Sequence, residues 1–244
     1  MLVLIHAFPL NARMWEPQLA IAERGWRVIA PHLRQFDGGA QDPSATSVDD
    51  FAGDIIDLLD ALHIQEAVIG GLSMGGYVSL AICRHAPRYV QGLVIADSRA
   101  EADTPEGTAS RKKMLALVAA KGPSAVVDEM LPKLVGSTTM ASRPDVVERV
   151  RSLALTSSTE AISGAITALM MRPDSTPTLA KIHVPTLIIA GAEDVITPPA
   201  LSEKMHNAMP GSELVLIPEA GHLSSLERPD VFNDTLANFL DHRV

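Results

Sequence analysis

The stretch Gly71-Leu72-Ser73-Met74-Gly75 decides the fold prediction for this chain. A short β-branched run precedes it at residues 66–71, and an apolar helical pattern follows it to about His85. A strand, a tight turn with serine at its apex and then a helix form the setting in which this spacing indicates a nucleophile elbow. Glycines flank the serine because side chains there would collide with the neighbouring strand and helix. We therefore expect the Ser73 hydroxyl to project from the carboxyl edge of a sheet, above the positive end of the next helix.

Strands and helices alternate on both sides of this turn. Apolar runs predict buried strands at residues 2–7, 26–30, 66–71, 90–96, 184–190 and 213–217. Helical spacing appears at residues 13–24 (apolar at Met14, Leu19 and Ile21), 47–63, 74–85, 199–209 and 229–242, and residues 32–46 have the composition of a loop. Ser47, with Asp50 three residues on, indicates a capping box. Nearly all-apolar strands separated by helices are typical of a mostly parallel sheet covered on both faces, an α/β fold.

The alternation stops between residues 98 and 180. Four helical patterns occur there without a strand, at about 107–120, 124–135, 144–155 and 159–171. Both ends of this segment return to the same sheet, so it is not an independent domain. We expect a core of residues 1–97 and 181–244 with a helical cap, residues 98–180, inserted into it.

Composition excludes several classes of partner. The chain has 244 residues and a net charge of −9, and it lacks a Lys/Arg cluster that could neutralise phosphates, which argues against nucleic acid. The single cysteine, Cys83, excludes an intramolecular disulfide, and no Cys/His spacing suits a metal such as zinc. Neither a signal peptide nor an apolar run of about 20 residues is visible, so we expect a cytoplasmic protein with no membrane partner.

Two residues could activate the serine. A serine hydroxyl needs a base, usually histidine, and that base needs a carboxylate to orient it. His222 follows the strand predicted at 213–217, and Asp194 follows the strand predicted at 184–190. Both positions lie at the carboxyl edge of the sheet, where Ser73 is also expected. We therefore predict Ser73, Asp194 and His222 as the catalytic residues.

The identity of the acid has alternatives. Asp97 follows the strand at 90–96 and is a rival acid, although it could instead anchor Arg99 or the first hinge of the cap. Glu193 is adjacent to Asp194 and is easily confused with it, and Asp194 itself could be a helix N-cap. We favour Asp194 as the acid.

Oxyanion stabilisation requires two backbone N–H donors where negative charge develops. Met74, the residue after the serine, should supply one donor. Phe8, in the loop after the first strand, should supply the other, because Pro9 has no N–H. We expect His6 to brace this loop through hydrogen bonds.

Four motifs in order resemble the α/β-hydrolase superfamily. They are His6-Ala7-Phe8-Pro9 followed by Trp15, the elbow Gly71–Gly76, the acid loop Gly191–Pro198, and Gly221-His222 with Glu227 and Pro229 after it. Within the superfamily the chain looks most like the carboxylesterase and 3-oxoadipate enol-lactonase-like group, which implies a helical cap and no cofactor.

The chain departs from that family pattern in three places. Ala7 stands where glycine is usual, and His32-Leu33-Arg34-Gln35 stands where D-x-R-G is common. The sequence also begins at the strand that leads to His6, where relatives usually have two earlier strands. We therefore expect a sheet of six strands.

These observations predict a serine hydrolase that cleaves carboxylic esters of small to medium, partly apolar substrates through an acyl-enzyme. An apolar roof over the site, or else ordinary cap core, is suggested by Met114, Met130, Leu131, Met170 and Met171.

The first alternative function is that of a lactonase or amidase of the enol-lactonase type. A dicarboxylate-type substrate would then need a cap arginine aimed at Ser73, and the sequence offers Arg99, Arg111, Arg143, Arg149 and Arg172. The second is a ligand receptor built on a hydrolase fold. The partner is expected to be a small-molecule ester or lactone, and the protein a monomer or homodimer.

Overall fold

A computed structural model describes residues 1–36 and 47–244 of the chain. Within these residues six parallel strands form one sheet in the order β2-β1-β3-β4-β5-β6. The strands are β1 (Leu2–Ile5), β2 (Val28–Ile29), β3 (Ala67–Leu72), β4 (Val90–Ala96), β5 (Thr186–Gly191) and β6 (Glu213–Ile217). The predicted parallel sheet of six strands is therefore confirmed.

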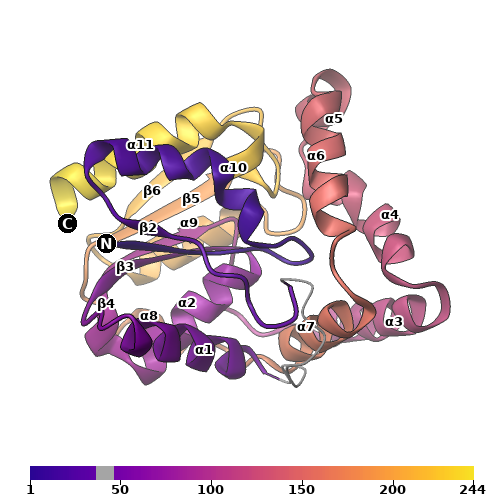
Figure 1. Cartoon of the computed structure of the whole chain (residues 1–244), viewed down its shortest axis with the longest axis horizontal. Coiled ribbons are helices and arrows are strands. Elements are labelled where there is room, and N and C mark those ends of the chain that lie inside the picture. The colour runs from indigo at the N-terminus through magenta and orange to yellow at the C-terminus, as the bar shows by residue number, and fades with distance from the viewer. Residues whose placement is uncertain (37–46) are drawn as a thin grey trace.

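Helices cover both faces of this sheet (Figure 1). On one face α1 (Val48–Ala61), α2 (Met74–His85) and α9 (Pro199–Ala208) pack on strand residues such as Ile5 and Ile69. On the other face η1 (Ala12–Arg24), α10 (Ser224–Glu227) and α11 (Pro229–Arg243) pack on residues such as Leu4 and Val68. Successive strand side chains thus enter two separate cores, which is why these strands are apolar at most positions.

The first predicted helix, η1, is a 3₁₀ helix. Its buried side chains Ala12, Trp15, Gln18 and Ile21 recur every three residues, the period of a 3₁₀ helix. Leu19, expected on the apolar face, is consequently 46% exposed. Further along the chain, the Ser47–Asp50 capping box at the start of α1 is confirmed. Of the loop predicted at 32–46, residues 37–46 lie outside the described residues.

The segment between β4 and β5 is entirely helical. After the short helix η2 (Pro87–Tyr89) and β4, it contains α3 (Pro105–Lys121), α4 (Pro123–Leu134), α5 (Ser137–Ser142), α6 (Pro144–Ala154), α7 (Thr159–Met171) and α8 (Thr176–Leu179). The four predicted helices are present, but α5 and α8 were not predicted because they are too short to show a period. Figure 1 shows α3–α7 together at one end of the sheet.

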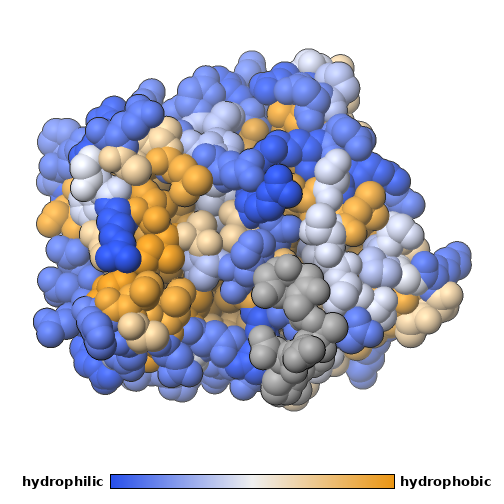
Figure 2. Space-filling model, viewed as in Figure 1, coloured by the Kyte–Doolittle hydropathy of each residue, from blue (hydrophilic) through white to orange (hydrophobic). Residues whose placement is uncertain are grey.

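The short strand β2 forms one edge of the sheet. Trp26, Val28, Ile29 and Ala30 at this edge are half-buried. Figure 2 shows hydrophobic surface on the face of the molecule that is turned to the viewer. The strand predicted at 26–30 is paired over only two residues, and so short an edge strand offers little backbone for pairing with another chain. Among the described helices, none combines the length and the apolar character needed to cross a bilayer.

Candidate active site

Ser73 lies on the turn between β3 and α2 with φ +54° and ψ −111°, a conformation that side-chain-bearing residues rarely adopt. The flanking glycines permit this turn. A Cβ atom on Gly75 would lie 2.1 Å from the Ile5 carbonyl oxygen, and one on Gly71 would lie 2.1 Å from the Gly75 carbonyl oxygen. The steric argument made for these glycines is confirmed.

His222 joins Ser73 to Asp194. Its Nε2 atom lies 2.8 Å from Ser73 Oγ, and its Nδ1 atom lies 2.8 Å from Asp194 Oδ2. All three residues are buried. His222 comes from the loop between β6 and α10, and Asp194 from the loop between β5 and α9. The structure thus brings together the three residues predicted from positions at strand ends.

The Asp194 carboxylate is held on both oxygens. Oδ1 accepts hydrogen bonds from the backbone N–H groups of Ile196 (2.8 Å) and Thr197 (3.0 Å), and Oδ2 accepts one from the Thr197 hydroxyl (2.7 Å). Burial alone would raise the pKa of Asp194, but the charge of His222 and these hydrogen bonds hold it below its usual value. The acid therefore remains an anion.

The Asp194 carboxylate changes the protonation equilibrium of His222. Burial opposes a charge on His222, but the Asp194 carboxylate raises the pKa of His222 above its ordinary value. With its Nδ1–H donated to Asp194, neutral His222 has a free lone pair on Nε2 for the Ser73 hydroxyl proton. The arrangement can therefore turn Ser73 into a nucleophile.

Thr197 was missed by the sequence reasoning. Besides its bond to Asp194, its hydroxyl lies 3.2 Å from His222 Nδ1. An aspartate followed two and three residues later by backbone donors forms an Asx-type turn. The threonine three residues after the acid was the available signal.

The rival acids are bonded elsewhere. Asp97 is fully buried and accepts hydrogen bonds from the Gly191 N–H (2.7 Å) and the Ser224 hydroxyl, with none from His222 among the described contacts. Burial, followed by the negative charge of Asp194, raises the pKa of Asp97 to about 8. The alternative role of Asp97 as an anchor for Arg99 is wrong, because Arg99 pairs with Asp103 instead.

Glu193 is hydrogen-bonded to α5, and no contact between it and His222 occurs among the described residues. Its carboxylate accepts from the Thr138 N–H (2.8 Å) and the Ser137 hydroxyl (2.9 Å) at the start of α5. It therefore ties the acid loop to the helical segment between β4 and β5.

One expected oxyanion donor, Met74, follows Ser73 directly in the chain, and the other, Phe8, lines the same cavity as Ser73. Met74 is the first residue of α2, so its N–H has no partner within the helix. Phe8 lines the cavity at Ser73, and its N–H makes no hydrogen bond to any residue in the described ranges.

His6 braces the loop that carries Phe8, as expected. Its Nε2 accepts a hydrogen bond from the Leu33 N–H (3.1 Å), so Nδ1 carries the proton and donates to the Ala7 carbonyl oxygen (3.1 Å). The ring is fully buried, and this burial lowers the pKa of His6 to about 4. His6 is therefore a neutral structural residue at physiological pH.

A cavity of about 60 Å³ opens at the serine. Its lining consists of Phe8, Ser73, Tyr77, Arg99, Arg111, Met130, Leu169, Ile196, Thr197 and His222. A second cavity of about 200 Å³ shares four of these residues and also contacts Met114. Two methionines of the expected apolar roof therefore face these cavities. Met171 does not belong to it, because it is 65% exposed at the end of α7.

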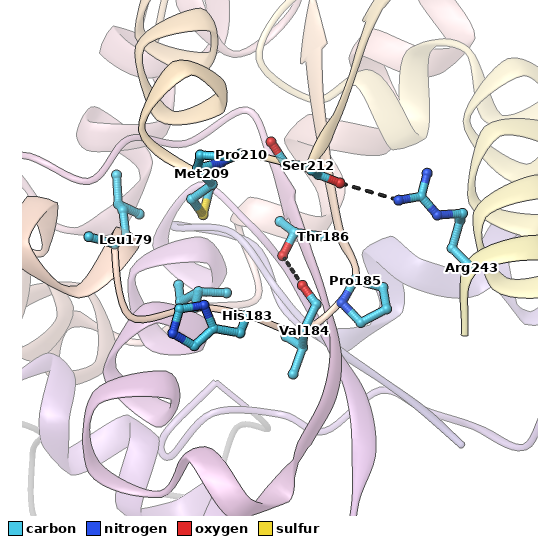
Figure 3. A pocket seen from close by; sticks show the side chains of 12 residues that line it. Leu179, His183, Val184, Pro185, Thr186, Met209, Pro210, Ser212 and Arg243 are labelled. Atoms are coloured by element: carbon cyan, nitrogen blue, oxygen red, sulfur yellow. Dashed lines mark hydrogen bonds between the residues drawn. The ribbon is translucent and has the colours of Figure 1, made fainter.

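Another cavity lies away from these residues. It has a volume of about 500 Å³ and is formed around the amino end of β5 by residues that include His183, Thr186, Met209 and Arg243 (Figure 3). None of the groups around Ser73 lines it, so it is not part of the site. In the described ranges no group of three or more His, Cys, Asp or Glu side chains could hold a metal ion, and we assign no metal ligands.

The chain belongs to the alpha/beta hydrolase family, whose family model matches residues 2–235. Among solved structures, it superimposes on a thermophilic esterase from Thermogutta terrifontis with a TM-score of 0.94 and 35% identity, covering 98% of this chain and 89% of that one. The enol-lactonase from Burkholderia xenovorans gives a TM-score of 0.90 and 26% identity over 99% and 91% of the two chains. The 3-oxoadipate enol-lactonase 2 of Acinetobacter baylyi is 26% identical over 95% of this chain and 85% of its own length.

Proposed function

We propose that this protein is a carboxylic ester hydrolase in which Ser73, His222 and Asp194 form the catalytic triad. The observation that carries the proposal is the continuous line of 2.8 Å hydrogen bonds from Ser73 Oγ through the imidazole to Asp194 Oδ2. An imidazole oriented by a buried carboxylate is the arrangement that activates a weak hydroxyl nucleophile. The similarity to an esterase and to enol-lactonases supports a carbonyl ester as the group attacked.

The first half of the reaction acylates the serine. His222 Nε2 takes the Ser73 proton while Oγ bonds to the carbonyl carbon, and the carbonyl π electrons move to its oxygen. The N–H groups of Phe8 and Met74 bind the resulting oxyanion. When the carbonyl re-forms, the C–O bond to the alcohol breaks, and the alcohol leaves with the proton from His222.

The second half releases the acid. A water molecule gives a proton to His222 and attacks the acyl carbon, forming a second oxyanion in the same place. Its collapse breaks the bond to Ser73 Oγ, which recovers its proton from His222. In both halves Asp194 stabilises the imidazolium form, which agrees in direction with the raised pKa of His222.

Within this proposal, residues 98–180 act as a cap on a core made of residues 1–97 and 181–244. Support comes from the cavity at Ser73, since Arg111 of α3, Met130 of α4 and Leu169 of α7 form part of its wall. These helices would therefore contact the substrate and select its shape, while the core supplies the reacting groups.

A lactone is the second candidate substrate, favoured by the two enol-lactonase relatives. The same steps apply, except that the leaving hydroxyl stays attached to the acyl group. With an amide as substrate, His222 would have to transfer its proton to the leaving nitrogen more completely than to the leaving oxygen of an ester. A ligand receptor with the same contacts would turn over barely once.

Hydrolysis of p-nitrophenyl esters from acetate to decanoate tests the proposal. We expect saturable multiple turnover on short chains, lowered by several orders of magnitude in Ser73→Ala. Ser152→Ala, at an exposed serine of α6, is the matched control and should behave as the wild type. Absence of multiple turnover on every chain length would overturn the ester hydrolase, and a lactone series would then separate a lactonase from a receptor.

A further inference from the structure

One short segment is hydrogen-bonded at, or close in the chain to, all three residues of the proposed triad. It is Ala96-Asp97-Ser98 at the carboxyl end of β4, which we call the β4 corner. The Ala96 carbonyl oxygen accepts a hydrogen bond from the Ser73 N–H (2.9 Å), and the Ser98 hydroxyl donates to the Ser73 carbonyl oxygen (2.9 Å). The β4 corner therefore holds the backbone of the nucleophile on both sides.

Asp97, in the middle of this corner, extends the contacts toward the acid and the base. Its Oδ1 atom accepts a hydrogen bond from the N–H of Gly191 (2.7 Å), where the loop that leads to Asp194 begins. Its Oδ2 atom accepts one from the hydroxyl of Ser224, two residues after His222. One fully buried side chain thus joins the loop of the acid to the chain that follows the base.

The backbone of Asp97 has an unusual conformation. Its φ is +45°, in the left-handed region that residues with a side chain seldom occupy. Its N–H donates to the Ile189 carbonyl oxygen (2.9 Å), so the chain turns away from the sheet from a fixed peptide. Such a conformation persists only where the surrounding contacts determine it, and here it places the carboxylate between Gly191 and Ser224.

The two hydrogen bonds of Asp97 do not by themselves require an ionisable group. An asparagine would accept from Gly191 through its oxygen, and the Ser224 hydroxyl can accept from an amide as well as donate. Burying a carboxylate costs more than burying an amide, and this burial, followed by the charge of Asp194, raises the pKa of Asp97 to about 8. Groups whose pKa is shifted in this way gather at functional sites.

The charges that face Asp97 come from the two loops that it joins. Asp194 of the β5–α9 loop opposes its ionisation, and His222 of the β6–α10 loop favours it. Burial opposes a charge on the imidazole, whereas the carboxylates of Asp194, Asp97 and Glu227 favour that charge and raise the pKa of the ring. Along the described strands β3, β4 and β5 there is no titratable side chain. The ionisation of Asp97 is therefore linked to the proton on His222.

We propose that Asp97 is a positioning residue that holds the loops of the acid and the base together and, when ionised, stabilises the imidazolium form of His222. The inference rests on the proposed function, because the imidazolium forms only when the ring takes the Ser73 proton or that of water. Asp97 acts through the ring, since the residues that line the described cavity at Ser73 do not include it. A second anion near the imidazolium lowers the barrier in both halves of the reaction.

The test is the pH dependence of kcat/KM for a p-nitrophenyl ester, measured from about pH 5.5 to 9.5. We expect the activity of the wild type to rise in two steps, first with the titration of His222 and again near pH 8 as Asp97 ionises. The second step should be about three- to tenfold, which corresponds to an interaction of about half to one pKa unit. Asp97→Asn keeps the shape but not the charge, so its activity should rise in one step and level off at a lower value.

Two further variants separate the charge from the hydrogen bond between the loops. Ser224→Ala keeps the charge of Asp97 but removes a hydrogen bond that favours its ionised form, so the second step should remain and move to higher pH. Asp145→Asn makes the matched substitution at an exposed aspartate of α6 and should leave the whole profile unchanged. If Asp97→Asn fails to fold, the other two profiles decide, and a second step that does not move in Ser224→Ala overturns the proposal.

The outcomes separate this proposal from the proposed function. A single step in the wild type, or two unchanged steps in Asp97→Asn, would overturn the role of Asp97 and leave the ester hydrolase intact. If no ester is hydrolysed, the proposed function fails, and an NMR titration of isotope-labelled histidine then judges Asp97. A lower pKa of His222 in Asp97→Asn than in the wild type supports the linkage, and an unchanged pKa overturns it.

Discussion

The Glu227 carboxylate joins Gly136 to the loop that carries His222. One oxygen accepts a hydrogen bond from the Gly136 N–H (2.7 Å), and the other accepts from the N–H groups of Gly221 (2.9 Å) and Leu223 (3.2 Å). The side chain is buried, and Gly136 lies in the loop between α4 and α5. A single side chain therefore fixes both the position of the histidine loop and its contact with the helical segment.

Removing the Glu227 carboxylate should lower both the stability of the protein and its kcat. Glu227→Ala leaves three backbone N–H groups without their acceptor, which we expect to lower the unfolding free energy by about 3 to 5 kcal/mol. Glu227→Gln retains one acceptor oxygen but turns an amide N–H toward a backbone donor. The unfolding free energy of this variant should therefore lie between those of the wild type and Glu227→Ala. Urea unfolding and kcat measured together check this.

Glu219→Gln is the matched control for Glu227. Glu219 lies on the same loop, but its side chain is 63% exposed and pairs with Arg228 at the surface. Its replacement should change stability by no more than about 0.5 kcal/mol. Equal effects of the two glutamates would contradict the bridging role of Glu227.

The two aspartates near His222 should respond very differently to the same substitution. In Asp194→Asn the amide N–H₂ would favour the wrong histidine tautomer, and kcat should fall by about 10⁴-fold. Asp97→Asn is isosteric and keeps the oxygen that accepts from Gly191, so kcat should stay within about 10-fold of the wild type. If Asp97→Asn showed the larger loss of kcat on a p-nitrophenyl ester, the acid assignment would be reversed.

Activity should rise with pH through the titration of His222. The base must be neutral to accept the Ser73 proton, and its pKa is raised by Asp194. The acidic limb of kcat/KM should therefore have its midpoint above the ordinary histidine value of about 6.5. His85→Gln, which removes a half-exposed histidine on α2, should leave the limb in place. A midpoint below that value would argue against the Asp194–His222 pair.

His6 should make stability depend on pH in the acidic range. Its pKa is lowered to about 4, so between about pH 4 and 6.5 the unfolded chain binds a proton there that the folded protein does not. The neutral His6 ring therefore contributes about 3 kcal/mol to the unfolding free energy above pH 6.5, and this contribution is lost as the pH falls toward 4.

The measurement is urea unfolding of the wild type and His6→Gln at several pH values. Their difference isolates His6, because the raised pKa of Asp97 acts in the opposite direction over part of this range in both proteins. A difference that does not vary with pH would refute the assignment of a neutral buried imidazole.

Much of the site could be predicted because its parts lie at strand ends. The alternation of strands and helices placed Ser73, Asp194 and His222 at one edge before any contact was known. What could not be predicted depends on contacts between distant parts of the chain. Glu227 and Gly136 are 91 residues apart, and their meeting has no local signature. The same holds for the three arginines that contact Asp103, because the sequence could name them only among five candidate cap arginines.

The direct pairing of β4 with β5 makes the sheet independent of the length of the segment between these two strands. The backbone leaves the sheet after Ala96 and returns at Thr186 on the neighbouring strand, and the Asp97 N–H still bonds to the Ile189 carbonyl oxygen. Everything between these points can be lengthened, shortened or exchanged without altering strand order. Arg99 and Arg111 lie inside that stretch, while Ser73, Asp194 and His222 lie outside it. Changes confined to this one continuous segment could thus alter the walls of the cavity at Ser73 while leaving the proposed catalytic residues in place.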